Sequence, residues 1–356
     1  MGLVLVMNAG STSVKLRLVD EDGAATAIDS PDDAPAGVEA VGHRIVHGGE
    51  RFRAPALLDD ATLDELDDLS ALAPLHNGPA LELAREARRR FADVPHVAAF
   101  DTAFHATIPE EASTYAVPRA WREDWGIRRY GFHGLSVQWA AERAAAMLGG
   151  RPARLVVCHL GGGASATAVR DGRSVDTTMG FSPLEGLVMA TRAGSLDPDV
   201  PVHLVLRRGL AADEVERALN EESGLLALAG KGGMREVEAA AQGGDARATL
   251  ALDVHDHRLA AAVAAMAASL GGLDALVFTG GAGEKSARLR AAAARRLAFL
   301  GVAVDAGLND RAEPDAEVSP PDAAVRTLVV RAREEVVIAR AVRWVLAEGP
   351  PRRGEP

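Results

Sequence analysis

Arginine, histidine and carboxylate residues recur in short segments beside glycines along this chain. GHRIVHGGE carries His43, Arg44 and His47, AAFDTAFH places Asp101 after an apolar run, and YGFHG surrounds His133 with glycine and aromatic residues. An arginine inside a short apolar strand requires an anionic partner, because burial of an uncompensated charge is costly. Its planar guanidinium suits a carboxylate or a phosphate. For Arg44, a structural salt bridge and a substrate carboxylate are equally acceptable interpretations.

Two polar turns have the composition of phosphate-binding turns. NAGSTSVK (8–15) offers backbone N–H groups, hydroxyls and Lys15, and CHLGGGAS (158–165) places three glycines where a ligand could approach the backbone closely. Each turn follows an apolar run and precedes a second predicted strand, so the strand–turn–strand unit occurs twice, about 150 residues apart. This repetition predicts a duplicated α/β core whose two hairpins bind a polyphosphate.

Three further signals each allow two explanations. VFTGGAGEKS places Gly281 and Gly283 between a strand and a helix, which suits either a loop against adenosine or a dinucleotide-binding turn, although Ser286 replaces the third glycine of the latter. Asp101 follows a strand, where it could line a ligand cleft or cap a helix. Glu334 begins a predicted helix, where it could bind a metal ion or complement the helix dipole.

The apolar periodicity predicts the elements that position these residues. Strands are expected over 41–49, 96–100, 275–281, 302–306 and 326–330, and helices over 61–72, 80–91, 136–148, 211–219, 286–297 and 335–347. Residues 234–270 are expected to be mainly helical. Their alanine-rich run from Leu259 is shorter than the ~20 residues of a membrane span, so we expect a buried helix.

Composition restricts the class of protein. The 356 residues suffice for two domains, and the net charge of −11 disfavours nonspecific nucleic-acid binding. The single cysteine, Cys158, excludes an intrachain disulfide and fits a reducing compartment. No basic stretch precedes the short apolar run at the N-terminus, which argues against a signal peptide. We therefore expect a cytoplasmic protein with no membrane and no nucleic-acid partner.

Nine segments, taken in order from Val4 to Arg340, resemble the acetate kinase family. They are VLVMNAGSTSVKL, VGHRIVHGGE, LAPLHN, VAAFDTAFHATIP, RRYGFHGLS, CHLGGGAS, SVDTTMGFSPLEGLVMATRAGSLDP, VFTGGAGEKS and EEVVIAR. The resemblance implies an α/β fold of the sugar kinase/Hsp70/actin superfamily, with two ribonuclease-H-like domains and an active-site cleft between them. Residues 1–148 and 336–356 would form the acyl and phosphate-side domain, and residues 149–335 the nucleotide-binding and dimerisation domain.

The resemblance also implies an activity, cofactors and partners. A homodimer would transfer the γ-phosphoryl group of ATP reversibly to acetate, giving ADP and acetyl phosphate, with Mg²⁺ or Mn²⁺. The catalytic residues would be Asp101, Arg44, Arg192 and His133. Arg44 would bind the substrate together with a small apolar pocket of Val46, Leu75, Phe132 and Pro183.

The remaining implied roles concern ATP and the metal ion. ATP and its phosphates would be bound by Asn8, Ser11, Ser13, Lys15, His159, Leu160, Gly161, Gly162, Gly163, Gly281, Ala282 and Gly283. Asn8 and Glu334 would position the metal ion. His76 and His159 would make supporting contacts.

Four positions depart from the family pattern. Gly162 stands where asparagine is usual, Ala190 replaces a glycine, Ala282 replaces a bulkier aliphatic residue and Lys285 replaces an asparagine. The segment before Val41 is also shorter than is typical. The substitutions lie on the nucleotide side, so another nucleotide or pyrophosphate is an alternative donor to ATP.

The sequence alone leaves other functions open. Propionate or another short-chain carboxylate is an alternative acceptor, because a pocket discriminates one methylene only ~10–200-fold. A nucleotide-binding module without transfer would have no need of Arg44, Arg192 and Asp101. A dehydrogenase would depend on GGAGEKS alone.

Overall fold

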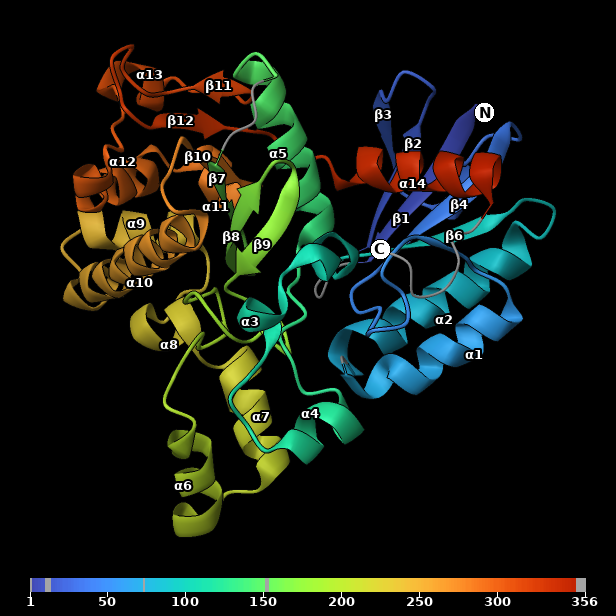
Figure 1. Ribbon diagram of the computed structural model, residues 1–356, viewed down its shortest axis with the longest axis horizontal. Helices are drawn as coiled ribbons and strands as arrows, with labels where there is room; N and C mark the ends of the chain where they lie inside the picture. Colours follow the sequence, from blue (N-terminus) through green and yellow to red (C-terminus); the bar gives the residue numbers. More distant parts are fainter. Residues whose placement is uncertain (1, 10–13, 73, 151–153, 350–356) are drawn as a thin grey trace. The chain divides into compact units, whose positions relative to one another are not determined.

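Two six-stranded mixed sheets form the framework of the structure, one in each of two units (Figure 1). The computed structural model describes residues 2–9, 14–72, 74–150 and 154–349, without the side chains of 71, 72 and 74–76. Unit 1 comprises residues 1–108, 115–139 and 332–356, and unit 2 comprises 109–114 and 140–331. These units divide the chain at slightly different residues from the two predicted domains.

The two sheets share one strand plan. In spatial order, the sheet of unit 1 consists of β3 (Ala25–Ile28), β2 (Val14–Val19), β1 (Leu3–Ala9), β4 (Val38–Ile45), β6 (His96–Phe100) and β5 (Ala56–Leu57). The sheet of unit 2 consists of β9 (Arg173–Thr177), β8 (Ala164–Arg170), β7 (Arg154–Leu160), β10 (Ala275–Thr279), β12 (Arg326–Val329) and β11 (Ala316–Glu317).

Each sheet begins with three antiparallel strands, continues with two strands parallel to the third, and ends with a short antiparallel strand. The predicted duplicated α/β fold is therefore confirmed.

Helices cover both faces of the unit 1 sheet. This unit contains η1 (Pro31–Asp33), α1 (Asp60–Asp68), η2 (Leu69–Leu72), α2 (Pro74–Arg90), η3 (Ala103–Thr107), α4 (Arg119–Trp125) and α14 (Glu334–Glu348). Strand alternation sorts the core: Val4 and Val6 pack with α14, whereas Leu5 and Met7 pack with Ala87 of α2. A strand buried on both faces reads as a continuous apolar run, which is the pattern of β1.

Gly42 allows α14 to lie directly on β4. A Cβ atom at this position would come within 2.7 Å of Ile338 and 2.9 Å of Val342, both on α14. This close approach places the first turn of α14, which carries Glu334, in contact with the polar side chain of Asn8.

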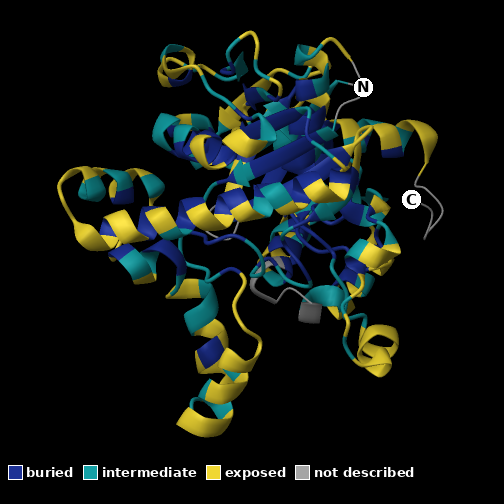
Figure 2. Ribbon diagram, turned by 60° about the vertical axis from the view of Figure 1, so that its left-hand side comes forward, coloured by how far each residue is buried: buried dark blue, intermediate teal, exposed yellow. Residues whose placement is uncertain are grey.

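Unit 2 contains most of the helices. They are α3 (Glu110–Ser113), α6 (Asp199–Arg208), α7 (Ala212–Glu221), α8 (Gly224–Ala229), α9 (Met234–Gln242), α10 (Ala246–Leu270), α11 (Gly280–Lys285), α12 (Ala287–Arg296), η4 (Ala298–Leu300) and α13 (Ala306–Asp310). Helix α5 (Gly134–Met147) contains the boundary at residues 139 and 140. Buried residues, dark blue in Figure 2, are concentrated in the strands and on one side of α10.

Most predicted elements are present, with two corrections. No strand runs over 302–306: only Val302 forms an isolated bridge, and Asp305 instead caps α13 by accepting a hydrogen bond from Leu308 N. The glycine turn after β10 is a short helix, α11, and Ser286 begins α12 by accepting from Leu289 N. Among the described residues, no helix has the length and apolar character needed to cross a membrane.

Candidate active site

Arg44 and Asp101 form a buried ion pair in unit 1. Arg44 is the next-to-last residue of β4, and Asp101 follows the neighbouring parallel strand β6. Arg44 Nη2 lies 2.5 Å from Asp101 Oδ2, and its Nε lies 3.2 Å from both carboxylate oxygens. Asp101 therefore orients Arg44, and the alternative of a helix cap is wrong, because Thr102 is the residue at the cap of η3.

Asn8 and Glu334 extend this pair into a four-residue network. Asn8 Oδ1 accepts a hydrogen bond from Arg44 Nη1 at 3.2 Å, and Asn8 Nδ2 donates to Glu334 Oε2 at 2.6 Å. Ala9 O accepts a further bond from Arg44. The predicted site residues Asn8, Arg44, Asp101 and Glu334 are thus brought together from three strand ends and the first turn of a helix.

Burial and charge act in opposite directions on this network. Burial alone would lower the pKa of Arg44, but the carboxylates of Asp101 and Glu334 more than offset it and raise that pKa. Burial raises the pKa of the Asp101 carboxyl, opposed by the charge and hydrogen bonds of Arg44 and by the His133 backbone N–H. Arg44 remains a cation that is 13% exposed, which suits the recognition of an anion.

His133 lies in a strained turn beside Asp101. Its φ of +61° is left-handed, a conformation that histidine seldom adopts. Gly134 N donates to Asp101 O at 3.0 Å, and a Cβ atom on Gly134 would lie only 2.1 Å from the same oxygen. Only glycine permits this approach, which holds His133 next to the ion pair.

The predicted acyl-pocket residues are distributed over both units. Val46 and Phe132 are buried in unit 1, where the His47 ring packs edge-on against Phe132 with centroids 5.4 Å apart. Pro183 is in unit 2, where its carbonyl accepts a hydrogen bond from Arg192 Nη1 at 3.1 Å. Burial lowers the pKa of Arg192. Leu75 and His76 lie in α2, and their side chains are outside the described residues.

The two glycine turns of unit 2 adjoin each other. Gly280, at the start of α11, has a φ of +78°, and a Cβ atom there would lie 2.8 Å from Leu160 O. A Cβ atom on Gly161 would lie 3.9 Å from Gly281 N. The backbone at the end of β7 therefore lies beside the backbone at the start of α11. The latter segment includes Gly281, Ala282 and the buried Gly283.

Gly162 is exposed in this turn. A Cβ atom at Gly162 would meet no described atom within 4 Å, and one at Gly161 would make only ordinary contacts at 3.6 Å or more. No described protein atom thus requires glycine at either position. Gly162 O accepts a hydrogen bond from Ala190 N at 3.1 Å, which joins two of the positions that depart from the family pattern.

The other predicted phosphate contacts are less completely described. Lys15 is exposed on β2 and pairs in register with Asn8 across the first hairpin, and Ser11 and Ser13 lie outside the described residues. His159, half-buried on β7, lies opposite Thr279 of β10. Lys285 is exposed at the end of α11.

Two residues that contact predicted site residues were given no role from the sequence. Arg290 of α12 is only 2% exposed and donates to Gly283 O at 2.9 Å and to Asn309 Oδ1 at 2.7 Å. Its sequence context is that of an ordinary surface arginine, so no local signal could have identified it. His105 contacts Phe132 O at 2.9 Å, and burial lowers its pKa to about 4. Its proximity to Asp101 in the sequence was the only available signal.

The chain is similar in sequence and in structure to known proteins. Residues 25–340 match the acetokinase family. An acetate kinase of Micrococcus luteus is 44% identical, with 98% of this chain and 100% of that protein covered. A solved propionate kinase of Francisella tularensis superposes with a TM-score of 0.90 at 35% identity, covering 96% of this chain and 99% of that one. A solved acetate kinase of Porphyromonas gingivalis gives 0.86 at 34% identity, covering 97% and 100%.

Proposed function

The chain belongs to the acetokinase family, and we propose that it transfers the γ-phosphoryl group of ATP reversibly to acetate, giving ADP and acetyl phosphate. As a member of this family it is a phosphotransferase with a carboxyl group as acceptor. The observation that carries the proposal is the buried Arg44–Asp101 pair with Asn8 and Glu334 at its side.

The chemistry requires charge stabilisation more than activation. A carboxylate oxygen of acetate attacks the γ-phosphorus, the bond from that phosphorus to the β–γ bridging oxygen breaks, and the bridging oxygen leaves with ADP. Acetate is already an anion, so no base is needed. The main obstacle is repulsion between the carboxylate and the polyphosphate, and phosphoryl transfer relies chiefly on positioning and charge stabilisation.

We assign this stabilisation to Arg44, Arg192 and His133. The Arg44 guanidinium donates to Asp101, Asn8 and Ala9, which restricts it to one orientation. An oriented guanidinium binds an anion with less loss of side-chain entropy. Arg192 supplies a second guanidinium, held by the carbonyl of Pro183, and His133 would hydrogen-bond the transferring group. Asp101 acts by holding Arg44.

Mg²⁺ fits the donor set of Asn8 and Glu334. Both offer hard oxygen ligands, and Mg²⁺ is commonly bound by one or two protein oxygens together with substrate phosphates. The described residues include no cluster of three or more His, Cys, Asp or Glu side chains suited to a metal ion, so the phosphates of ATP would supply further ligands. Bound Mg²⁺, or Mn²⁺, would neutralise part of the phosphate charge.

Substrate selection is assigned to apolar contacts and to backbone. Val46 and Phe132, with Leu75 and Pro183, would surround the methyl group of acetate, and Val46 would crowd a longer acyl chain. On the donor side, Gly161, Gly281 and Gly283 would lie against ATP. Because Gly162 has no side chain to contact the phosphoryl donor, the protein would restrict the identity of the donor less than that of the acceptor.

A donor and acceptor panel tests the function. ATP, GTP and pyrophosphate are each combined with acetate and propionate, and the acyl phosphate is trapped with hydroxylamine. We expect ATP with acetate to give the highest kcat/KM, with measurable propionate turnover. A preference for pyrophosphate, or for propionate, would replace the proposed donor or acceptor. Wild-type activity in Arg192→Ala would refute direct transfer stabilised by two arginines.

We also propose a cytoplasmic homodimer. The resemblance to the family and the single buried cysteine support this proposal. Light scattering during gel filtration should give twice the chain mass of 37.1 kDa, and cell fractionation should recover the activity with cytosolic markers. A monomeric active species or a membrane-bound pool would contradict it.

A further inference from the structure

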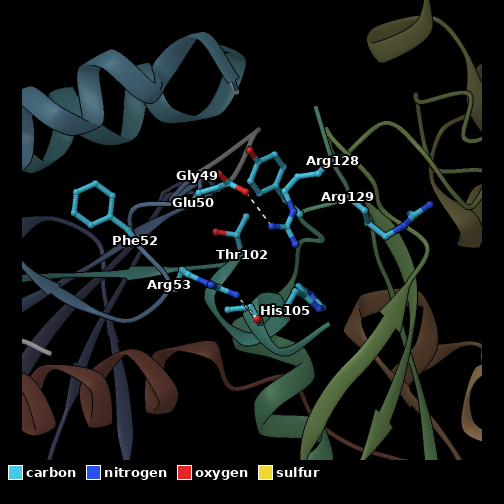
Figure 3. A pocket seen from close by; sticks show the side chains of 10 residues that line it. Gly49, Glu50, Phe52, Arg53, Thr102, His105, Arg128 and Arg129 are labelled. Atoms are coloured by element: carbon cyan, nitrogen blue, oxygen red, sulfur yellow. Dashed lines mark hydrogen bonds and ion pairs between the residues drawn. The ribbon is translucent and has the colours of Figure 1, made fainter. Parts of the chain in front are cut away.

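A cavity of about 260 Å³ lies in unit 1 (Figure 3). It is bordered by the loop after β4, which carries Glu50 and Arg53, and by Thr102 and His105 around η3. Arg128 and Arg129 close it from the segment before α5. The described lining includes none of the residues assigned to acetate, ATP or the metal ion.

The lining carries a net positive charge in an acidic protein. It contains three arginines and one glutamate, which gives a formal charge of +2, whereas the whole chain has −11. His105 adds no charge at neutral pH, because burial lowers its pKa to about 4. A cationic concavity of this size attracts a compact anion.

Arg53 and Arg128 retain donors for such an anion. Arg53 Nη2 donates to Ala106 O at 2.7 Å, a neutral partner, and among the described residues no carboxylate forms an ion pair with it. Arg128 Nη1 is bonded to Glu50 Oε1 at 2.9 Å, which orients its guanidinium toward the cavity, as Figure 3 shows. Arg129 lies over the Tyr115 ring at 5.5 Å.

The buried hydroxyl group of Thr102 adds a directional hydrogen-bond donor to the cavity. Thr102 is 5% exposed, and its Oγ1 accepts a hydrogen bond from Gly48 N at 3.1 Å. A hydroxyl that accepts in this way still has its own hydrogen to donate. Arg53, Arg128 and Thr102 therefore present donors to one cavity from three different segments of the chain (Figure 3).

We propose that this cavity binds a small oxyanion of the phosphate class. Tetrahedral oxygens suit the forked donors of Arg53 and Arg128 and the single donor of the Thr102 hydroxyl. Thr102 directly follows Asp101, so the bound anion lies next to the turn that holds the Arg44 partner.

Calorimetric titration with inorganic phosphate tests the site. Arg53→Met should weaken phosphate binding about 10–100-fold, as expected for one charge-assisted hydrogen-bonding partner. Arg51→Met is the matched control, because Arg51 is an exposed arginine two residues away that does not line the cavity, and its affinity should stay within about twofold. Phosphorylation of acetate, measured without added phosphate, should be unchanged in both variants, which separates this site from the proposed function.

A second variant and a structural readout keep the test decisive. If Arg53→Met fails to fold, Arg128→Met should weaken phosphate binding about tenfold. Crystals soaked with selenate should show an anomalous peak between Arg53 and Arg128. Equal weakening in Arg51→Met, unchanged binding in Arg53→Met and Arg128→Met, or no binding to the wild type would overturn the proposal.

Discussion

Substitutions of Arg44 and Asp101 should have non-additive effects on both the free energy of unfolding and the catalytic activity. Their side chains are only 13% and 1% exposed, so removal of one partner leaves a largely buried, uncompensated charge. Breaking such a pair typically costs 3–5 kcal/mol. Because Asn8 and Ala9 also accept hydrogen bonds from Arg44, we expect Asp101→Asn to lower the free energy of unfolding by about 3 kcal/mol.

A double-mutant cycle isolates this coupling. Urea unfolding of the wild type, Arg44→Met, Asp101→Asn and the double variant should give a coupling free energy of about 3 kcal/mol. The control cycle uses Arg119 and Glu123 on α4, whose Nε and Oε1 atoms are 2.6 Å apart but whose side chains are 79% and 56% exposed. Solvent screening should limit that coupling to about 0.5 kcal/mol or less.

Kinetics of the same four proteins test the assigned roles. Arg44→Met should lower kcat/KM for acetate by about 10³–10⁵-fold, the range known for transition-state arginines. Asp101→Asn should lower it about 10²-fold by misplacing the guanidinium. If Asp101 acts through Arg44, the double variant should be no less active than Arg44→Met. Multiplicative losses in activity, or equal coupling free energies in the buried and exposed cycles, would refute this reasoning.

Three further outcomes follow. Gly162→Asn should fold normally, since a Cβ atom there meets no described atom within 4 Å, and should change the ATP KM while leaving the acetate KM nearly untouched; an effect confined to acetate would contradict the assignment. Val46→Ala should raise kcat/KM for propionate relative to acetate by about tenfold or more, and an unchanged ratio would remove Val46 from the acyl pocket. The pKa of His105 lies at about 4 in the folded protein and near 6.5 unfolded, so the unfolded state binds the additional proton between these values, and stability should fall as pH is lowered through that window. In urea unfolding, the free energy of unfolding should fall by up to about 3 kcal/mol between pH 7.5 and 4.5 because of His105. The free energy of unfolding of His105→Asn should depend less steeply on pH. An equal pH dependence in the two proteins would show that His105 does not cause this loss of stability.

Local composition was sufficient to predict the duplicated α/β core. The strand–turn–strand unit around NAGSTSVK and CHLGGGAS indicated a duplicated α/β core, because alternating apolar runs and glycine turns express backbone preferences that act over a few residues. Because it also rested on local composition alone, the prediction of a strand over 302–306 was wrong. Its apolar residues resemble a strand, but only Val302 finds a pairing partner, and Asp305 caps a helix instead.

Pairing between distant residues was decided only by the tertiary structure. Arg44 alone left a salt bridge and a substrate contact equally open, and the parallel pairing of β4 with β6 is what brings Asp101 to its guanidinium. Asn8 meets Glu334 across 326 residues because Gly42 lets α14 pack against β4. Arg290 became recognisable only through its burial against Gly283 and Asn309. Residue types and short-range periodicity determine which groups are available, whereas strand register and helix packing determine which of them share an environment.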